Sequence, residues 1–304
     1  MIGFNLNKAK QHFTSVLMEQ FPQREAEQLM RILLEDFFSI DLKRQLMNPD
    51  MRIDEVEYAI LEDAVKQLLR GVPVQYVTRK AWFDGLLFYV DKSVLIPRPE
   101  TEGLVRLVAE ELALKAGQEG GTSDKPLRIW DVGSGSGCIA IALAKRFPKA
   151  EIIAFDVSEK ALATAKMNVI INEVQMELVC DDVLNPQSEL WNQPVDLVVS
   201  NPPYIRESEK AGMEPNVLDH EPHSALFVPD DDPLLIYRQI LTLAKPQLTA
   251  QGSIWFEINE ALGEEMVQLC HEMGFEAIIR SDFAGKPRFL HIFAIKNNTK
   301  QPLI

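Results

Sequence analysis

The stretch Asn201-Pro202-Pro203-Tyr204 ends an apolar run, 195–199, that is typical of a buried strand. Two adjacent prolines remove two backbone donors and exclude a helix at this point. The Asn201 side-chain oxygen and the Pro202 carbonyl could accept two N–H bonds from one amino or amide group, and Tyr204 could pack on its plane. The stretch is therefore either a turn that ends a strand or a grip for a flat, nitrogen-bearing group.

A glycine-rich loop, Gly133-Ser134-Gly135-Ser136-Gly137, lies between a strand-like run and a helix-like run that begins at Cys138. Glycines let the chain turn tightly and let a ligand approach the backbone, while a helix N-terminus offers free N–H groups. The G-x-G-x-G spacing differs from that of dinucleotide folds, and no Walker lysine follows. Taken alone, such a loop is structural as often as it is a ligand site.

Two carboxylates follow neighbouring strands. Asp156 ends the second strand, where a carboxylate can accept both hydroxyls of a ribose. Its alternative role is the N-cap of the next helix, although Ser158 is better placed for that. Asp182 could accept an adenine amino group with Val183 packed on the ring; the alternative is a solvated loop acid.

The elements that must position these residues alternate between strand and helix patterns. Strand-like runs occupy 127–132, 151–156, 176–180, 195–199 and 253–258, and helical stretches separate the first four. This alternation predicts an α/β fold with a doubly wound, mostly parallel sheet, and residues 275–296 predict an antiparallel edge pair. The carboxyl ends of parallel strands meet at one edge, so the glycine loop, both carboxylates and the Asn201 stretch are expected to converge there. Glu257 ends the fifth strand at this edge, where it borders the pocket or supports a loop.

The N-terminal part of the chain predicts helices. Apolar residues from Ala26 to Phe38 recur on one helical face, and a second stripe contains Val56, Ile60, Ala64 and Leu68 before a helix stop at Gly71. Residues 48–50 predict a turn. Two β-rich stretches within 72–91 flank Asp84-Gly85, a strong hairpin signal.

We therefore predict three parts: a helical substrate-recognition domain over 1–71, a β-hairpin connector over 72–95, and a ligand-binding domain over 96–304. A flexible loop is expected at 117–126 within the last of these. The helical part has no cluster suited to catalysis, so docking of a substrate and simple stabilisation are both open.

Composition argues against several classes of protein. The chain has 304 residues, 46% of them hydrophobic, and a net charge of −14, which argues against direct nucleic-acid binding. No apolar run has the length of a membrane span, and no secretion signal is visible. The three cysteines have neither disulfide nor metal-ligand spacing, and His220 with His223 lacks a third ligand, so we expect no metal and a cytoplasmic location.

Six motifs make the chain resemble the peptide-chain release factor glutamine N5-methyltransferases, from about Gly71 to Ala294. The motifs are DVGSGSGCIAIALA, DVSEKALATAKMN, SNPPYI, LIPRPETE, EPHSALFVPDDDPLLIYR and GSIWFEI. Arg79 departs from the family, which often has glycine at that position. The resemblance implies a seven-stranded, Rossmann-like methyltransferase fold that is dependent on S-adenosylmethionine.

The resemblance also implies residue roles. The loop from Gly133 to Gly137 would hold the methionine moiety, Asp156 the ribose, and Asp182 with Val183 the adenine. Asn201, Pro202, Pro203 and Tyr204 would hold the acceptor glutamine amide, with Asn201 contacting the donor as well. The implied substrate is the Gly-Gly-Gln loop of class I release factors.

Three other functions remain as alternatives. An adenine-N6 methyltransferase of DNA or RNA would use the same Asn-Pro-Pro-Tyr grip, but it predicts a basic groove. A ribosomal-protein glutamine methyltransferase is less favoured because of the PRPETE stretch. A non-catalytic nucleotide-binding protein would not be expected to keep the grip intact.

Overall fold

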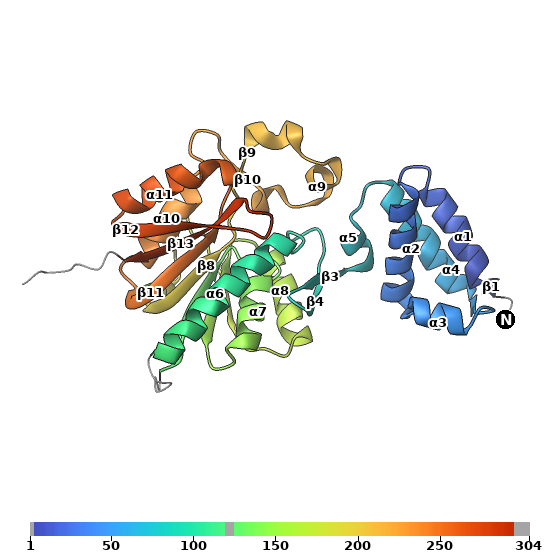
Figure 1. Ribbon diagram of the computed structural model, residues 1–304, viewed down its shortest axis with the longest axis horizontal. Helices are drawn as coiled ribbons and strands as arrows, with labels where there is room; N and C mark the ends of the chain where they lie inside the picture. The colour runs from blue at the N-terminus through green and yellow to red at the C-terminus, as the bar shows by residue number, and fades with distance from the viewer. Residues whose placement is uncertain (1–2, 119–124, 295–304) are drawn as a thin grey trace, which may run out of the picture. The chain divides into compact units, whose positions relative to one another are not determined.

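The computed structural model describes residues 3–118 and 125–294, and contacts divide the chain into two units (Figure 1). The first unit contains the chain up to Ala81, with Val90–Lys92 and Met213–Glu221. The second contains Trp82–Tyr89, Ser93–Gly212 and the chain from Pro222 onward. The segment 72–95 is thus shared between the units. Of the loop predicted over 117–126, residues 119–124 lie outside the described residues.

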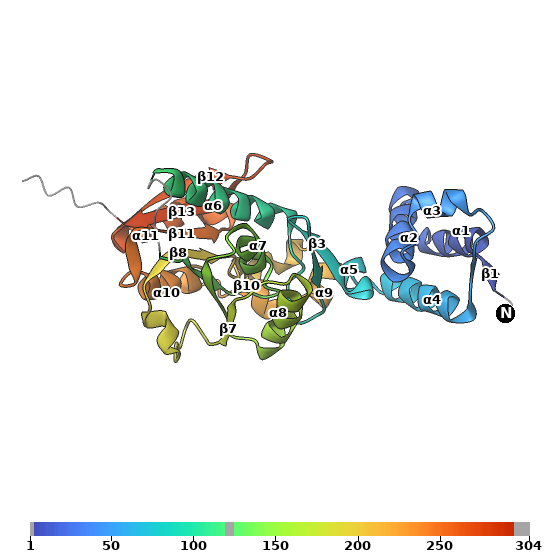
Figure 2. The ribbon, with the colours of Figure 1, turned by 90° about the horizontal axis from the view of Figure 1, so that it is seen from below.

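The first unit is helical, as Figure 2 shows from a second side. Its elements are β1 (Phe4–Asn5), α1 (Leu6–Leu17), α2 (Gln23–Phe38), α3 (Leu42–Met47), β2 (Arg52–Ile53), α4 (Glu55–Leu69), α5 (Val74–Thr78) and α9 (Pro215–His220). Side-chain oxygens of Asn5, Asp41 and Asp54 accept backbone N–H bonds at the starts of α1, α3 and α4. The predicted turn at 48–50 separates α3 from β2.

The two predicted apolar stripes of this unit differ in outcome. In α2, Ala26, Leu29, Met30, Leu33 and Leu34 are buried, as predicted. The α4 stripe was partly wrong. Ala64 and Leu68 of the predicted stripe are buried, whereas Val56 is 67% exposed and Ile60 39% exposed. Leu61 and Val65 complete the buried face. Two apolar faces were available in this sequence, and packing against α1 selected the one that tertiary contacts could cover.

Residues 74–78 were expected to be β-rich, and this was wrong: they form the short helix α5. Arg79 caps α5 in the left-handed conformation, with φ 59°. Glycine adopts this conformation without a Cβ penalty, which gives a physical reason for the glycine common in the family at this position.

The predicted hairpin is present as β3 (Lys80–Phe83) and β4 (Leu86–Tyr89). Asp84 and Gly85 between them have φ values of 54° and 74°. Positive φ at both central residues is the requirement of the turn that matches strand twist in a two-residue hairpin, which is why Asp-Gly predicted it.

Within the described residues, seven strands form the sheet of the second unit in the order β12-β13-β11-β8-β5-β6-β7. They are β5 (Arg128–Val132), β6 (Glu151–Asp156), β7 (Glu177–Cys180), β8 (Val195–Ser200), β11 (Leu248–Glu257), β12 (Phe275–Ser281) and β13 (Pro287–Ala294). Neighbours from β11 to β7 pair in parallel, whereas β13 is antiparallel to both β11 and β12. The α/β fold, the parallel centre and the antiparallel edge pair are confirmed.

Helices cover both faces of this sheet. Figure 1 shows α6 (Pro99–Gln118), α7 (Cys138–Arg146) and α8 (Glu159–Ile171) on one face, and α10 (Leu235–Ala244) and α11 (Gly263–Glu272) on the other. The expected helix between the third and fourth strands was wrong, because that connection holds only the 3₁₀ turn η1 (Glu189–Asn192). This turn places Trp191 in the core, where its ring stacks on Phe155 at 3.6 Å between centroids.

The remaining elements are short. They are β9 (Ile205–Arg206), which pairs in parallel with β10 (Phe227–Val228), and the 3₁₀ turns η2 (Glu207–Gly212), η3 (His223–Ala225) and η4 (Glu260–Leu262). Among the helices of the described residues, none combines the length and apolar character that a membrane crossing requires.

Candidate active site

A cavity of about 360 Å³ lies within the second unit, at the carboxyl ends of the parallel strands. This volume is in the range of small-molecule sites. The loops after β5, β6, β7 and β8 all contribute to its wall, as the strand pattern predicted. The predicted site residues that line it are Gly133, Ser134, Gly135, Ser136, Asp156, Asp182, Val183, Asn201, Pro202 and Pro203. Gly137 and Tyr204 are not part of the wall.

The glycine loop exposes its backbone to this cavity. Gly133 and Gly135 have φ values of 72° and 56°, and a Cβ built on either would meet no atom within 4 Å. These positions therefore leave open space in which a ligand can approach the main chain. Gly137 serves packing instead, because a Cβ there would come within 3.2 Å of Ile141 and 3.4 Å of Ala165.

Asp156 braces the loop from the end of β6. Its Oδ2 accepts from Gly135 N at 2.8 Å, and its Oδ1 accepts from Ser158 N at 2.8 Å. Ser158 is the N-cap of α8, accepting from Ala161 N, so Asp156 is not needed for that role. Burial raises the pKa of Asp156, although the two backbone N–H groups oppose this rise. Each carboxylate oxygen keeps acceptor capacity for a further donor.

The loop after β7 is organised by Asp181. Its carboxylate accepts from Gln187 N, Ser188 N and Trp191 Nε1, the last at 2.8 Å. This leaves Asp182 and Val183 on the cavity wall. Asp182 Oδ1 accepts from Leu184 N in a local turn, which holds the carboxylate in place.

Asp131, at the end of β5, lies directly beneath the glycine loop and is fully buried. Its Oδ2 accepts from Ser134 Oγ at 2.7 Å and from Ala140 N at 3.3 Å, while its Oδ1 has no hydrogen-bond partner among the described residues. Burial raises the pKa of Asp131 to about 7. A buried carboxylate beside this loop, in its ionised form, is an electrostatic complement for a cation.

The Asn-Pro-Pro-Tyr stretch splits into two parts. Asn201, Pro202 and Pro203 line the cavity, while the Tyr204 ring packs against the core and its hydroxyl donates to Glu257 Oε1 at 3.1 Å. Asn201 Nδ2 donates to Thr101 Oγ1 at 3.2 Å. Glu257 is 1% exposed and is not on the cavity wall, so it supports this loop from behind.

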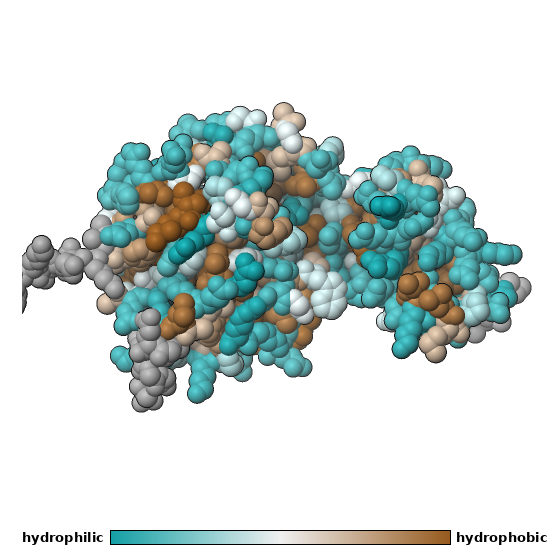
Figure 3. Space-filling view, viewed as in Figure 1, coloured by the Kyte–Doolittle hydropathy of each residue, from teal (hydrophilic) through white to brown (hydrophobic). Residues whose placement is uncertain are grey.

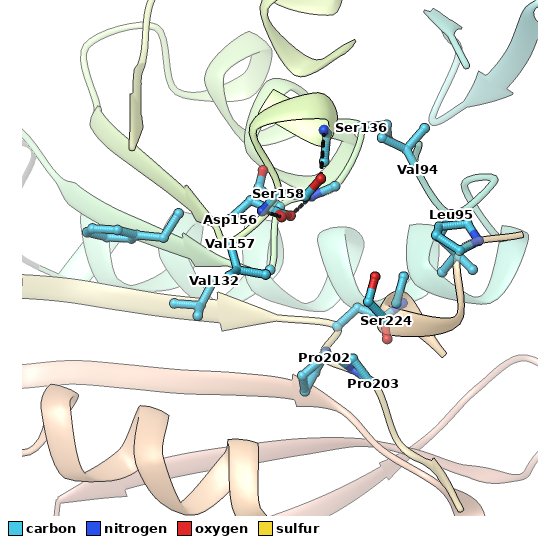
Figure 4. Close-up of a pocket in the computed structure, with 18 of the residues that line it drawn as sticks. Val94, Leu95, Val132, Ser136, Asp156, Val157, Ser158, Pro202, Pro203 and Ser224 are labelled. Carbon is cyan, nitrogen blue, oxygen red and sulfur yellow. Dashed lines mark hydrogen bonds between the residues drawn. The ribbon is translucent and has the colours of Figure 1, made fainter. Parts of the chain in front are cut away.

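Figure 4 shows how these parts face one another. Asp156 and Ser158 lie beside the start of a helix, Pro202 and Pro203 lie across the cavity from them, and Val94 and Leu95 border a third side. One end of the cavity thus presents carboxylates and open backbone. The other end is lined by Asn201, Pro202 and Pro203, and the two prolines bring no backbone N–H group.

Sequence reasoning missed two contributions to the cavity. One is the segment before α6 together with its first turn, where Ser93, Val94 and Thr101 line the wall; the other is the turn with Pro222 and Ser224. Their signals were present in the LIPRPETE and EPHSAL stretches. Neither segment follows a parallel strand, so the expectation that ligands bind at the carboxyl ends of such strands did not predict that they line the cavity.

Comparison with known proteins shows two matching family models. The PrmC N-terminal domain matches residues 8–78, and the methyltransferase small domain matches residues 121–218. Among solved structures, ribosomal protein L11 methylase from Lactobacillus delbrueckii subsp. bulgaricus aligns with a TM-score of 0.44 and 21% identity, covering 65% of this chain and 80% of its own.

Full-length relatives carry one common name, release factor glutamine methyltransferase. The protein from Flavobacterium psychrophilum is 42% identical over 92% of this chain and 96% of its own length. That from Bacteroides thetaiotaomicron is 36% identical, covering 94% and 99%. That from Streptococcus pneumoniae is 39% identical, covering 71% and 72%. At these identities and coverages, the chain belongs to the release factor glutamine methyltransferase family.

Proposed function

We propose that this protein transfers a methyl group from S-adenosylmethionine to the side-chain nitrogen of the glutamine in the Gly-Gly-Gln loop of class I release factors. A sulfur–carbon bond breaks, a nitrogen–carbon bond forms, and one amide proton leaves to solvent. The observation that carries the proposal is a single cavity with a glycine loop and carboxylates at one end and Asn201-Pro202-Pro203 at the other. The name shared by the full-length relatives favours a release factor as acceptor.

The residues present fit the donor. S-adenosylmethionine supplies a methyl group already activated by a sulfonium. The open backbone at Gly133 and Gly135 suits the methionine moiety, with Ser134, Ser136 and the helix-capping Gly137 completing the loop. Asp156 accepts the ribose hydroxyls with the acceptor capacity that its two backbone contacts leave. Asp182 accepts the adenine amino group, and Val183 packs on the ring.

Electrostatics favour the same ligand. The donor carries two positive groups and one carboxylate, hence a net positive charge. Asp131 and Asp156 both accept hydrogen bonds from the glycine loop, through Ser134 Oγ and Gly135 N respectively. When ionised, Asp131 adds negative charge in a site of low dielectric constant, where charge is weakly screened.

At the acceptor end, the task is orientation. An amide nitrogen is a weak nucleophile because its lone pair is delocalised, a resonance that also gives peptides a rotation barrier of about 18–20 kcal/mol. The Asn201 oxygen and the Pro202 carbonyl accept the two N–H bonds and point the nitrogen along the line to the methyl group. The fixed φ of Pro203 holds the stretch rigid. Tyr204 positions the grip by fixing Glu257, and its contact with the amide plane stays a prediction.

This chemistry needs neither a metal ion nor a base before transfer, because the leaving group is neutral and the proton departs afterwards. We extend the proposal to a cytoplasmic enzyme that contacts no nucleic acid directly and no membrane. The unpaired state of Cys138, Cys180 and Cys270 suits a reducing compartment, and the net charge of −14 is unfavourable for a phosphate backbone.

We assign the helical part of the chain, predicted as 1–71, to recognition of the release factor. It contributes no residue to the cavity wall. An adenine amino group would fit the same Asn201 grip, so an adenine methyltransferase is the function to test against. The names of the relatives favour the protein substrate.

The test is methylation of a purified release factor with S-adenosylmethionine, followed by mass spectrometry of the Gly-Gly-Gln peptide. We expect one added methyl group on the glutamine, and none on a release factor in which that glutamine is replaced by glutamate. Methylation of adenine in DNA or RNA, with an unmodified release factor, would contradict the proposal.

A further inference from the structure

We propose that Thr101 and Glu257 are positioning residues that hold the Asn201 amide with its oxygen toward the cavity, through one hydrogen-bond chain of fixed direction. The inference rests on the proposed function, in which this oxygen accepts an N–H bond from the substrate glutamine. It assigns a role to two side chains that take no part in the chemistry itself.

The chain joins three distant segments. Asn201 Nδ2 donates to Thr101 Oγ1 at 3.2 Å, and Thr101 Oγ1 donates to Glu257 Oε2 at 2.7 Å. Asn201 follows β8, Thr101 lies in the first turn of α6, and Glu257 ends β11. Thr101 is 2% exposed and Glu257 1% exposed, so bulk water does not compete for these contacts.

The direction of the chain follows from donor and acceptor counts. A carboxylate only accepts, and a threonine hydroxyl has one hydrogen to give. That hydrogen goes to Glu257, so toward Asn201 the hydroxyl can only accept. Of the two ends of the Asn201 amide, only Nδ2 can donate. The amide nitrogen must therefore face Thr101, which leaves Oδ1 on the opposite side.

Glu257 is itself fixed from several elements. Its Oε1 accepts from the Tyr204 hydroxyl at 3.1 Å, and its backbone oxygen accepts from the Tyr237 hydroxyl at 2.8 Å. Arg288 on β13 stabilises the charge, whereas Glu100 on α6 opposes it. Burial raises the pKa of Glu257, and the hydrogen bonds from Thr101 and Tyr204 act against this rise. Both carboxylate oxygens of Glu257 therefore accept hydrogen bonds, so the Thr101 hydroxyl keeps donating to Glu257 and cannot donate to Asn201.

The consequence for the reaction is specific. If the Asn201 amide were turned over, its NH₂ group would face the NH₂ group of the substrate glutamine, and two donors would meet. The substrate amide nitrogen would then lose one hydrogen-bond acceptor and its alignment with the methyl group. Misplacement by about 1 Å can cost roughly a hundredfold in rate.

The test is the single-turnover rate of release factor methylation at saturating donor and substrate. Thr101→Val keeps the shape and removes the hydroxyl; we expect a loss of roughly tenfold to a hundredfold in rate. Thr101→Ser restores the hydroxyl and should recover most of the rate. Donor affinity should stay within about twofold in both, since Asp156 and the glycine loop are unchanged.

A matched control is Thr78→Val, because Thr78 is also a buried threonine and its Oγ1 makes no hydrogen bond within the described structure. This control should keep the wild-type rate. If Thr101→Val does not fold, Thr101→Ala replaces it in the same comparison.

A rate for Thr101→Val, or for Thr101→Ala in its place, within about twofold of the wild type would overturn the inference. So would a loss of donor affinity as large as the loss of rate, which would indicate a collapsed site. Wild-type protein that methylates no release factor would instead contradict the proposed function, so the two failures are distinguishable.

Discussion

At the scale of single residues, Asp131 gives a testable prediction of how donor binding depends on pH. Its burial gives a pKa of about 7, and its Oδ1 has no partner in the structure. A positively charged donor favours the ionised carboxylate, so binding should lower this pKa and release a proton. The affinity for S-adenosylmethionine is therefore expected to rise as pH increases from about 6 to about 8, by less than about tenfold per pH unit.

Titration calorimetry with the Asp131→Asn variant measures this linkage. Asparagine can still accept from Ser134 and Ala140, so the loop should persist while the dependence on pH flattens. The stability of the donor-free protein is expected to change with pH in the direction opposite to the donor affinity. The folded pKa of about 7 lies above the ordinary value of 3.8, so the free energy of unfolding of the donor-free protein falls as pH rises between these values. An unchanged pH dependence in Asp131→Asn would show that another group titrates.

Residue identities predicted some of the site and not the rest. Asp156 and Asn201 could be placed at the cavity because each lies at or directly after the end of a parallel strand, and such strand ends meet at one edge. Gly137 could not be separated from Gly133 and Gly135, since only the packing of Ile141 and Ala165 tells a structural glycine from a ligand-facing one. Thr101 and Glu257 lie 156 positions apart, and their contact depends on the placement of α6.

At the scale of elements, Arg79 is a testable departure from local propensity. It occupies the left-handed region at the end of α5, which costs residues with a Cβ about 1–2 kcal/mol. Arg79 contacts Asp91 at 3.9 Å while 58% exposed, and an ion pair of this kind contributes little. We expect Arg79→Gly to raise the free energy of unfolding by about 1 kcal/mol.

Chemical denaturation checks this, with Arg70→Gly as the control. Arg70 also ends a helix, but its φ is −90°, so glycine gains nothing there and should destabilise. If the two substitutions changed the free energy of unfolding by the same amount, the proposed backbone strain at Arg79 would be refuted.

Strands were predicted better than helix faces. The central strands β5, β6 and β8 are apolar runs that are largely buried, so their positions follow from composition alone. The α4 helix had apolar residues on two faces, and only the contacts of the fold decide between Val56 and Leu61. The start of β11 at Leu248 was missed because Ala250 and Gln251 are exposed and Gly252 is unfavourable within a strand.

At the scale of the whole molecule, recognition of an intact release factor needs more surface than the cavity provides. Leu42, Leu46 and Met47 on α3 are 58%, 74% and 71% exposed. Figure 3 shows hydrophobic side chains gathered over this part of the helical unit. Exposed apolar groups of this kind are typical of contact sites with other proteins.

We expect the double substitution Leu46→Ser and Met47→Ser to raise KM for the intact release factor about tenfold or more, since each buried large apolar side chain contributes about 1.5–3 kcal/mol. Methylation of a short Gly-Gly-Gln peptide should be unaffected. Leu114→Ser, at an equally exposed leucine of α6, serves as the control. An unchanged KM would exclude this surface from docking.

The central claim is that Asn201 orients the acceptor amide, and the direct measurement is single-turnover methylation of a release factor at saturating donor by Asn201→Ala. The account predicts a folded variant with donor affinity close to the wild type and a rate lower by roughly a hundredfold. Asn201→Asp should be nearly as slow, because a carboxylate cannot donate to Thr101. A wild-type rate in Asn201→Ala would contradict the account.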